Sequence, residues 1–151
     1  MTRPRVVLTF GTFDLFHVGH LRILERAAKL GDRLIVGVST DELNFRKKAR
    51  YPFVPQQDRR AIVAALRCVD ATFYEESLEK KREYLLQYGA DVLVMGHDWE
   101  GRFDEFRDIC EVCYLPRTED VSTTAIEALI KDRMSPTSQI GPKKPSGSQA
   151  G

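Results

Sequence analysis

The sequence predicts an α/β fold in which a parallel sheet is covered by helices on both faces. Short apolar runs alternate with longer amphipathic stretches, and the apolar runs are nearly continuous instead of alternating with polar residues. Strands that are apolar throughout are typical of parallel sheets, because both faces of such sheets are buried. The 151 residues suffice for one domain with a sizeable core, without disulfides or a structural metal.

Strands and helices are expected in alternation along the chain. The expected strands are the apolar runs 6–10, 34–39, 71–74, 92–95 and 111–115. The expected helices have apolar residues at helical spacing and cover 17–30, 58–66, 78–88 and 123–131. Gly31 and Gly89 end the first and the third of these helices. Residues 41–55 are polar and basic and contain prolines, which predicts a loop with some local helix.

The composition changes near Ser135 to Ser, Pro, Gly, Gln and Lys. A segment of this kind cannot bury enough apolar surface to order itself. We therefore assign a globular domain to residues 1–133 and a flexible C-terminal tail to residues 134–151.

Charge and cysteine content limit the classes of function. The formal net charge of +1 gives no overall field that attracts nucleic acid or a membrane surface, so an anion site has to be built locally. Three cysteines without a framework spacing argue against a secreted disulfide protein. The N-terminal residues lack a signal-peptide pattern and no apolar run is long enough to cross a bilayer. We therefore expect a cytoplasmic protein that binds no nucleic acid and does not insert into membranes.

The segment after the first strand carries the clearest sign of chemistry, reading Gly11-Thr12-Phe13-Asp14-Leu15-Phe16-His17-Val18-Gly19-His20. It follows a strand at the carboxyl edge of the expected sheet, where such folds bind their ligands. His17 and His20 are three residues apart at a helix start, so their rings lie on the same side. The free N–H groups and the positive dipole end of a helix start attract anions, and Gly19 lets a ligand approach the backbone. A polyphosphate site is favoured. A zinc site completed by His97 or a cysteine, or two ordinary helix residues, are the alternatives.

A second segment, Arg117-Thr118-Glu119-Asp120-Val121-Ser122-Thr123-Thr124, follows the fifth strand and precedes the last helix. Ser122 is a natural N-cap, so the start of that helix forms a second cradle for anions. Arg117 can grip phosphate oxygens with its planar guanidinium. The three spaced glycines of dinucleotide-binding proteins are absent, which leaves a dehydrogenase with little support.

Together these segments resemble the cytidylyltransferase family, which is marked by Gly-x-Phe-Asp-x-x-His-x-Gly-His and by Arg-Thr-x-Gly-[Ile/Val]-Ser-Thr-[Thr/Ser]. Residues 95–104, 39–42 and 114–118 are similar to the bacterial glycerol-3-phosphate cytidylyltransferases in particular. The resemblance covers residues 6–131. It implies a Rossmann-like, doubly wound five-stranded parallel sheet and a nucleotidyltransferase domain over residues 1–133. It also implies the synthesis of CDP-glycerol from CTP, with Mg²⁺ carried by the triphosphate, usually by a homodimer.

The resemblance also implies roles for individual residues. The expected catalytic residues are His17, His20, Lys47 and Arg117, with Lys48 as the alternative to Lys47. The expected nucleotide-binding positions are Thr12, Phe13, Gly19, Asp98, Trp99, Arg117, Thr118, Val121, Ser122 and Thr123. Lys47, Arg59 and Arg67 are the candidates for the acceptor's phosphate; a solvated helix surface is the alternative for the two arginines. No direct metal ligand is identifiable.

For several individual residues the sequence supports more than one interpretation. Asp14 is expected to order the 11–20 turn through backbone hydrogen bonds, with Mg²⁺ held through water as the alternative. Trp99 borders the nucleotide or is a core or dimer aromatic. Cys110 and Cys113 are expected on opposite faces of a strand, which disfavours a shared zinc or redox site. Asp120 stands where the family usually has glycine and puts a negative charge near the triphosphate.

Two other functions are compatible with the sequence. One is an adenylyltransferase of the same superfamily that acts on FMN or on a sugar phosphate. The other is a nucleotide-binding regulator without turnover.

Overall fold

The computed structural model describes residues 3–116 and 123–134. The chain separates into two compact units, Met1–Glu119 and Asp120–Gly151, and each is described by itself. The second unit contributes helix α5, Thr123–Met134, which begins where the sequence predicts a helix and continues three residues further. The extent of the domain and the tail assigned from composition stay predictions.

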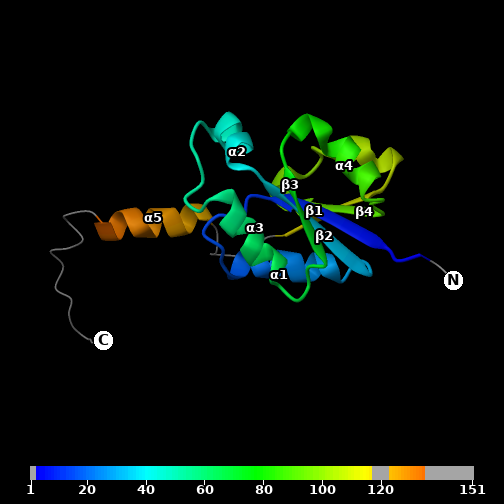
Figure 1. The fold of residues 1–151 in the computed structure, drawn as a ribbon, viewed down its shortest axis with the longest axis horizontal. Coiled ribbons are helices and arrows are strands. Elements are labelled where there is room, and N and C mark those ends of the chain that lie inside the picture. The colour runs from blue at the N-terminus through cyan, green and yellow to red at the C-terminus, as the bar shows by residue number, and fades with distance from the viewer. Residues whose placement is uncertain (1–2, 117–122, 135–151) are drawn as a thin grey trace. The chain divides into compact units, whose positions relative to one another are not determined.

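The first unit is built on a five-stranded parallel sheet with the strand order β3-β2-β1-β4-β5 (Figure 1). The strands are β1 Val6–Gly11, β2 Arg33–Ser39, β3 Ala71–Glu75, β4 Val92–Gly96 and β5 Glu111–Leu115. Thr9 of β1 lies opposite Val36 of β2 and Val94 of β4. The order reverses between β1 and β4, so the chain winds outward from this pair in both directions. The predicted doubly wound, Rossmann-like sheet is confirmed, and its switch point lies between β1 and β4.

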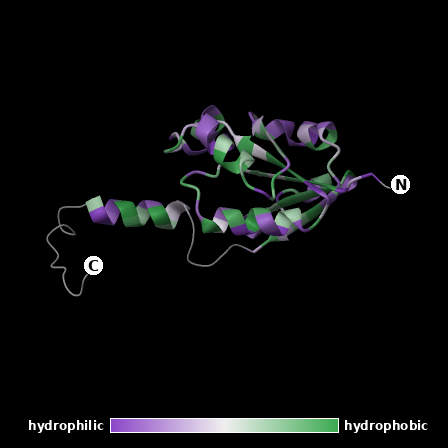
Figure 2. Ribbon diagram, turned by 60° about the horizontal axis from the view of Figure 1, so that its bottom comes forward, coloured by the Kyte–Doolittle hydropathy of each residue, from purple (hydrophilic) through white to green (hydrophobic). Residues whose placement is uncertain are grey.

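Helices cover both faces of the sheet, as the continuous apolar strands require (Figures 1 and 2). Helices α1, Val18–Ala28, and α3, Gln56–Ala64, pack Leu24, Ala27 and Val63 on one face. Helix α4, Lys81–Gln87, and the short 3-10 helix η3, Asp104–Asp108, pack Leu85 and Phe106 on the other. Two further 3-10 turns are η1, Leu78–Lys80, and η2, His97–Trp99. The sequence pattern predicted neither η2 nor η3.

Residues 41–48 form a regular helix, α2, in place of the expected loop with some local helix. The hydroxyl of Thr40 accepts from Leu43 N at 3.1 Å and caps the helix start. Acidic residues occupy the first turn of α2 and basic residues the last, which matches the helix dipole. Ala49, at φ 59°, ends the helix in a left-handed conformation. The polar, basic composition that suggested a loop therefore reflects an exposed helix with complementary charges.

The cysteines near β5 lie as expected. Cys110 packs with the core on the α4 side of the sheet, and Cys113 packs with the core on the α1 side. The two thiols therefore cannot share a zinc ion or form a disulfide with each other.

Candidate active site

The turn between β1 and α1 has the unusual backbone that the predicted site requires. Phe13 and Leu15 have positive φ angles of 57° and 48°, which non-glycine residues rarely adopt. The buried Phe13 ring folds back over Gly11, where a Cβ atom would lie 2.8 Å from the ring. Because the Phe13 side chain belongs to the core, its backbone is the part that a nucleotide can contact.

His17 and His20 form a reciprocal cap at the start of α1. Nδ1 of His17 accepts from Gly19 N at 3.0 Å, and Nδ1 of His20 accepts from His17 N at 3.2 Å. The rings stack with their centroids 3.9 Å apart, which confirms that they lie on the same side. The helix start thus fixes both imidazoles through its own hydrogen bonds, and the rings of Phe13 and Phe16 pack against His20.

These hydrogen bonds determine where each neutral ring carries its proton. Because both Nδ1 atoms accept, the proton of a neutral imidazole lies on Nε2. Nε2 of His17 is buried and has no hydrogen-bond partner among the described residues. Burial lowers the pKa of His17, and burial together with the neighbouring His17 lowers the pKa of His20 to about 3. The pair therefore offers neutral N–H donors at physiological pH.

Asp14 connects this turn to a distant part of the chain. Its Oδ1 accepts from Leu15 N at 3.1 Å and from Val54 N at 2.9 Å, and its Oδ2 accepts from Phe53 N at 2.8 Å. The bond from Leu15 orders the turn in the way the sequence predicts. The bonds from Phe53 and Val54 hold the segment between α2 and α3 against it. Asp14 is buried, and its described contacts give it a structural role.

Arg59 does not take the role that the sequence suggested. Its guanidinium is fully buried and donates to the carbonyl oxygens of Val54, Thr12 and Ser39 at 2.8, 2.7 and 2.8 Å. It also donates to Asp41 Oδ1 at 2.6 Å. A side chain used in this way cannot turn to an acceptor's phosphate. Arg59 instead ties together the ends of β1 and β2 and the start of α2, which is neither the predicted contact nor a solvated surface.

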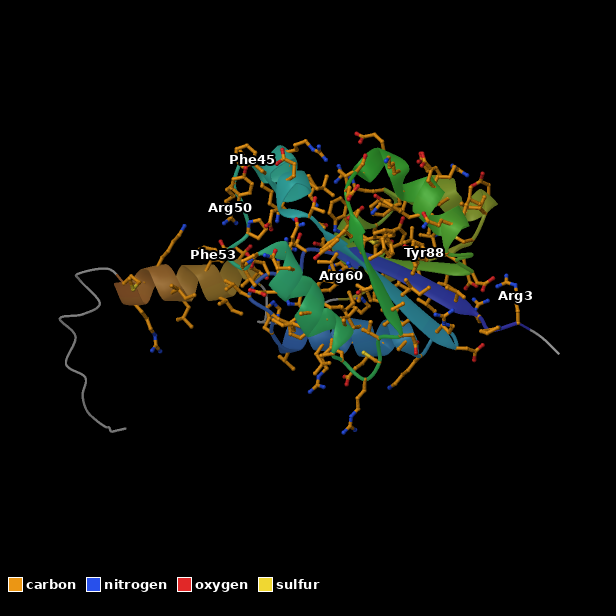
Figure 3. All side chains as sticks on the ribbon, in the orientation of Figure 1. Arg3, Phe45, Arg50, Phe53, Arg60 and Tyr88 are labelled. Carbon is orange, nitrogen blue, oxygen red and sulfur yellow. The ribbon has the colours of Figure 1, made fainter. Side chains whose placement is uncertain are left out.

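Thr12 follows β1, and Lys47 lies on α2. The Nδ2 amide of Asn44 donates to Thr40 O at 2.8 Å, which leaves Asn44 Oδ1 to accept the hydroxyl of Thr12 at 2.8 Å. The donor that Thr12 has left for a ligand is therefore its backbone N–H. Lys47 lies in the basic last turn of α2, and partial burial of its ammonium lowers the pKa of Lys47. In Figure 3, Phe45, Arg50 and Phe53 mark this end of the sheet, and Arg3 marks the opposite end.

The switch point brings the β4 exit beside the β1 exit. Asp98 and Trp99 lie in η2, directly after β4, while the histidine pair follows β1. Asp98 is exposed, whereas Trp99 is half-buried and packs against the core on the α4 side. Trp99 therefore combines a core contact with a position at the ligand edge.

The other predicted site residues lie in other segments of the chain or outside the residues that the structure describes. Arg67 follows the end of α3 and lines a surface cavity of about 480 Å³ with Leu21, Glu25 and Cys68. Thr123 is the first residue of α5, in the second unit. The segment with Arg117, Thr118, Asp120, Val121 and Ser122 lies outside the described residues.

A buried ion pair near the same edge escaped the sequence reasoning. Lys81 Nζ lies 2.8 Å from Glu75 Oε2, and both side chains are almost fully buried. Ser39 Oγ donates to Glu75 Oε1 at 3.0 Å, and the Lys81 ammonium lies 3.8 Å from the centre of the Phe10 ring. Burial lowers the pKa of Lys81, and the charge of Glu75 opposes this shift. A charge at the last position of an apolar strand was the available signal for Glu75.

The described residues contain neither a metal-binding cluster nor a membrane-spanning helix. In residues 3–116 and 123–134, no group of three or more His, Cys, Asp or Glu side chains is arranged to hold a metal ion. Across the same ranges, no helix has the length and apolar content needed to cross a bilayer.

The doubly wound sheet with a histidine pair at its switch point favours an α/β protein of the nucleotidyltransferase type. The cytidylyltransferase-like family model matches residues 8–129. The chain belongs to this family. Because its relatives of known activity are enzymes, this protein is an enzyme.

Individual relatives agree with this assignment. The chain is 48% identical to the glycerol-3-phosphate cytidylyltransferase of Bacillus subtilis (strain 168) over 121 residues, 80% of this chain and 93% of that protein. It is 46% identical to the protein of the same name from Staphylococcus aureus (strain NCTC 8325 / PS 47) over 123 residues, 80% of this chain and 91% of that protein. Among solved structures, a lipopolysaccharide core biosynthesis protein from Thermoplasma volcanium GSS1 matches with a TM-score of 0.68 and 21% identity, covering 78% of this chain and all of that one. This last likeness supports the fold alone.

Proposed function

We propose that this protein transfers CMP from CTP to a phosphorylated alcohol, sn-glycerol 3-phosphate, and releases CDP-glycerol and pyrophosphate. The observation that carries the proposal is the buried, unpartnered Nε2 of His17 beside the stacked His20, at a helix start on the switch point. Identity of 46–48% to two glycerol-3-phosphate cytidylyltransferases supports the choice of nucleotide and acceptor.

The reaction needs positioning and charge stabilisation more than a strong base. A phosphate monoester has its second pKa near ~6, so at neutral pH its oxygen is already a nucleophile. This oxygen forms a bond to the α-phosphorus of CTP, and the bond from that phosphorus to the bridging oxygen of pyrophosphate breaks. Negative charge moves onto the leaving group during this step. Neutral Nε2–H donors fixed in advance stabilise such charge at no cost of reorganisation.

The other residues divide the remaining tasks. Lys47 and Arg117 offset the charge of the triphosphate and of the incoming phosphate. The backbone at Thr12, Phe13 and Gly19 supplies further donors, and the resemblance to the family adds Thr118, Val121, Ser122 and Thr123. Asp98 and Trp99 border the cytosine and ribose. Arg67 remains a candidate contact for the acceptor's phosphate.

Mg²⁺ belongs to the proposal as a partner of the triphosphate. Both Asp14 oxygens accept backbone N–H groups, so the described site fits an ion that arrives on phosphate oxygens better than one held by a carboxylate cage. When bound, the ion would offset part of the negative charge of the triphosphate. The proposal also includes that the protein is a homodimer and that it works in the cytoplasm.

Pyrophosphate release tests the proposal directly. The purified protein would be assayed with each of four nucleoside triphosphates against a panel of phosphorylated alcohols, FMN and sugar phosphates. We expect turnover that requires both CTP and sn-glycerol 3-phosphate. A comparable or higher kcat/KM with ATP would identify an adenylyltransferase instead. Nucleotide binding without pyrophosphate release for any acceptor would identify a regulator.

A further inference from the structure

The segment between β4 and β5 carries Asp98 and Trp99 and is held in place from β5. Within it, Glu100 N donates to His97 O at 2.9 Å and Arg102 N donates to Trp99 O at 2.9 Å. Gly101, at φ 85°, is the third residue of the second turn, a position where a positive φ favours glycine. The turns are local, so they shape the segment without fixing it on the sheet.

Tyr114 of β5 supplies that anchor. Its hydroxyl accepts from Phe103 N at 3.0 Å and donates to Asp104 Oδ1 at 2.8 Å. Met95 is the residue opposite Tyr114 on β4, and the ligand edge begins one residue later, at Gly96. A tyrosine hydroxyl is protonated at neutral pH and can donate, and partial burial raises the pKa of Tyr114 further in the same direction.

One aromatic contact connects Trp99 to Phe103, the residue whose backbone Tyr114 holds. The rings of Trp99 and Phe103 lie 5.5 Å apart at their centroids, and the backbone of Phe103 is the group that Tyr114 holds. Both rings pack against the core on the α4 side. A shift of Phe103 therefore moves Trp99, and with it the adjacent Asp98.

We propose that Tyr114 is a positioning residue for the nucleotide, because its hydroxyl fixes the 97–104 segment and so places Asp98 and Trp99. The proposal rests on the proposed function in one respect, namely that Asp98 and Trp99 border the cytosine nucleotide. Tyr114 touches no reacting atom, so it acts on CTP binding and not on the chemical step.

The test uses Tyr114→Phe, which removes only the hydroxyl. Tyr84→Phe is the matched control, because the Tyr84 hydroxyl also accepts a backbone N–H, that of Glu76 at 3.0 Å, away from the 97–104 segment. Trp99 is the only tryptophan, so its fluorescence reports on this segment alone. The measurements are steady-state kinetics for CTP, Trp99 emission with and without CTP, and melting temperature.

We expect Tyr114→Phe, which loses both hydrogen bonds of the hydroxyl, to raise KM for CTP by about fivefold, with kcat changed less than about twofold. Its Trp99 emission should shift to longer wavelength in the free protein, because the ring is less well held. Tyr84→Phe should lower the melting temperature about as much as Tyr114→Phe does. It should keep the wild-type KM for CTP and the wild-type Trp99 emission. Asp104→Ala, which removes the acceptor of the Tyr114 hydroxyl together with an exposed ion pair to Arg107, should move KM and emission in the same direction by less.

Other outcomes overturn the inference. Wild-type emission together with an unchanged KM in Tyr114→Phe would make the hydroxyl purely structural, and so would an equal rise of KM in Tyr84→Phe. If Tyr114→Phe fails to fold, Asp104→Ala decides. An Asp104→Ala protein with the wild-type KM for CTP and the wild-type Trp99 emission would overturn the inference. Failure of the proposed function is distinguishable, since the wild-type protein would then release no pyrophosphate from CTP.

Discussion

His20 accepts the backbone N–H of His17 on its Nδ1, and its ring stacks on that of His17 at 3.9 Å. One consequence is that the two side chains most directly tied to chemistry also build the first turn of α1. Their donors toward a ligand are already oriented in the protein alone, which is the condition for electrostatic catalysis by preorganised groups. The predictions below test this arrangement and the buried charges that support it.

Replacing either histidine with alanine should lower kcat strongly and change CTP affinity much less. A lost donor of this kind typically costs about 3 kcal/mol of transition-state stabilisation, or ~10²–10³ in rate. The double variant should lose less than the product of the two, because both donors serve one charge cluster. Steady-state kinetics, melting curves and metal content of each variant provide the measurement.

His97→Ala is the control for these variants, since His97 is the third histidine of the chain and is exposed. It should keep the wild-type kcat. If zinc copurifies with the wild type and is lost in His97→Ala along with activity, the zinc alternative replaces the phosphate site. A well-folded His17→Ala protein with near-normal kcat would remove the main support for the mechanism.

The pH dependence of kcat/KM should follow the acceptor and not the histidines. Burial lowers the pKa of His20 to about 3 and places that of His17 below its ordinary value, so at neutral and alkaline pH both rings are neutral donors and a further rise in pH changes neither. The acidic limb should therefore lie near ~6, the second pKa of the acceptor's phosphate. With a phosphonate analogue of higher second pKa the limb should move upward. A limb that stays near the ordinary pKa of histidine for both acceptors would show that an imidazole controls it.

Arg59→Ala should destabilise the protein by about 3–5 kcal/mol, because it removes the partner of Asp41 and of three carbonyl oxygens around a buried site. Urea unfolding measures the loss. The neighbouring Arg60→Ala should cost about 1 kcal/mol, since Arg60 is only partly buried and bonds to Thr72. A stable Arg59→Ala protein with a raised KM for the acceptor alone would restore the phosphate contact predicted from the sequence.

Glu75→Gln should cost about 3–5 kcal/mol at neutral pH, because it leaves the buried ammonium of Lys81 unpaired. The double variant Glu75→Gln/Lys81→Met should recover much of this loss. Burial lowers the pKa of Lys81 in the folded protein, so the unfolded chain binds more protons below the ordinary lysine pKa, and stability rises with pH in that range. In the single variant the opposing charge of Glu75 is gone and the pKa of Lys81 falls further, so the deficit should shrink as the pH rises toward the ordinary lysine pKa. A deficit that is constant with pH would mean that the Lys81 charge is not its cause.

The sheet could be predicted from the sequence because its strands are apolar throughout and lie between helices of clear periodicity. The order of the strands adds the switch point, which explains why residues after β1 and β4 meet. The 41–48 segment was predicted less well, since an exposed helix with a cap and paired end charges lacks the apolar stripe that marks a helix in sequence. The short 3-10 turns η2 and η3 were missed for the same reason.

The sequence by itself determined the local geometry of the histidine pair, because two residues three apart at a helix start meet whatever surrounds them. It also determined the placement of Cys110 and Cys113 on opposite faces, through the two-residue period of a strand. Only the tertiary structure decided which charged residues serve the fold. Arg59 and Lys81 sit on helices whose periodicity shows that a position faces inward, but the partners that make a buried charge tolerable come from β1, β2, β3 and α2. The acceptors of Arg59 lie up to 47 residues away in the chain, so their convergence is a property of the folded sheet and of no local pattern.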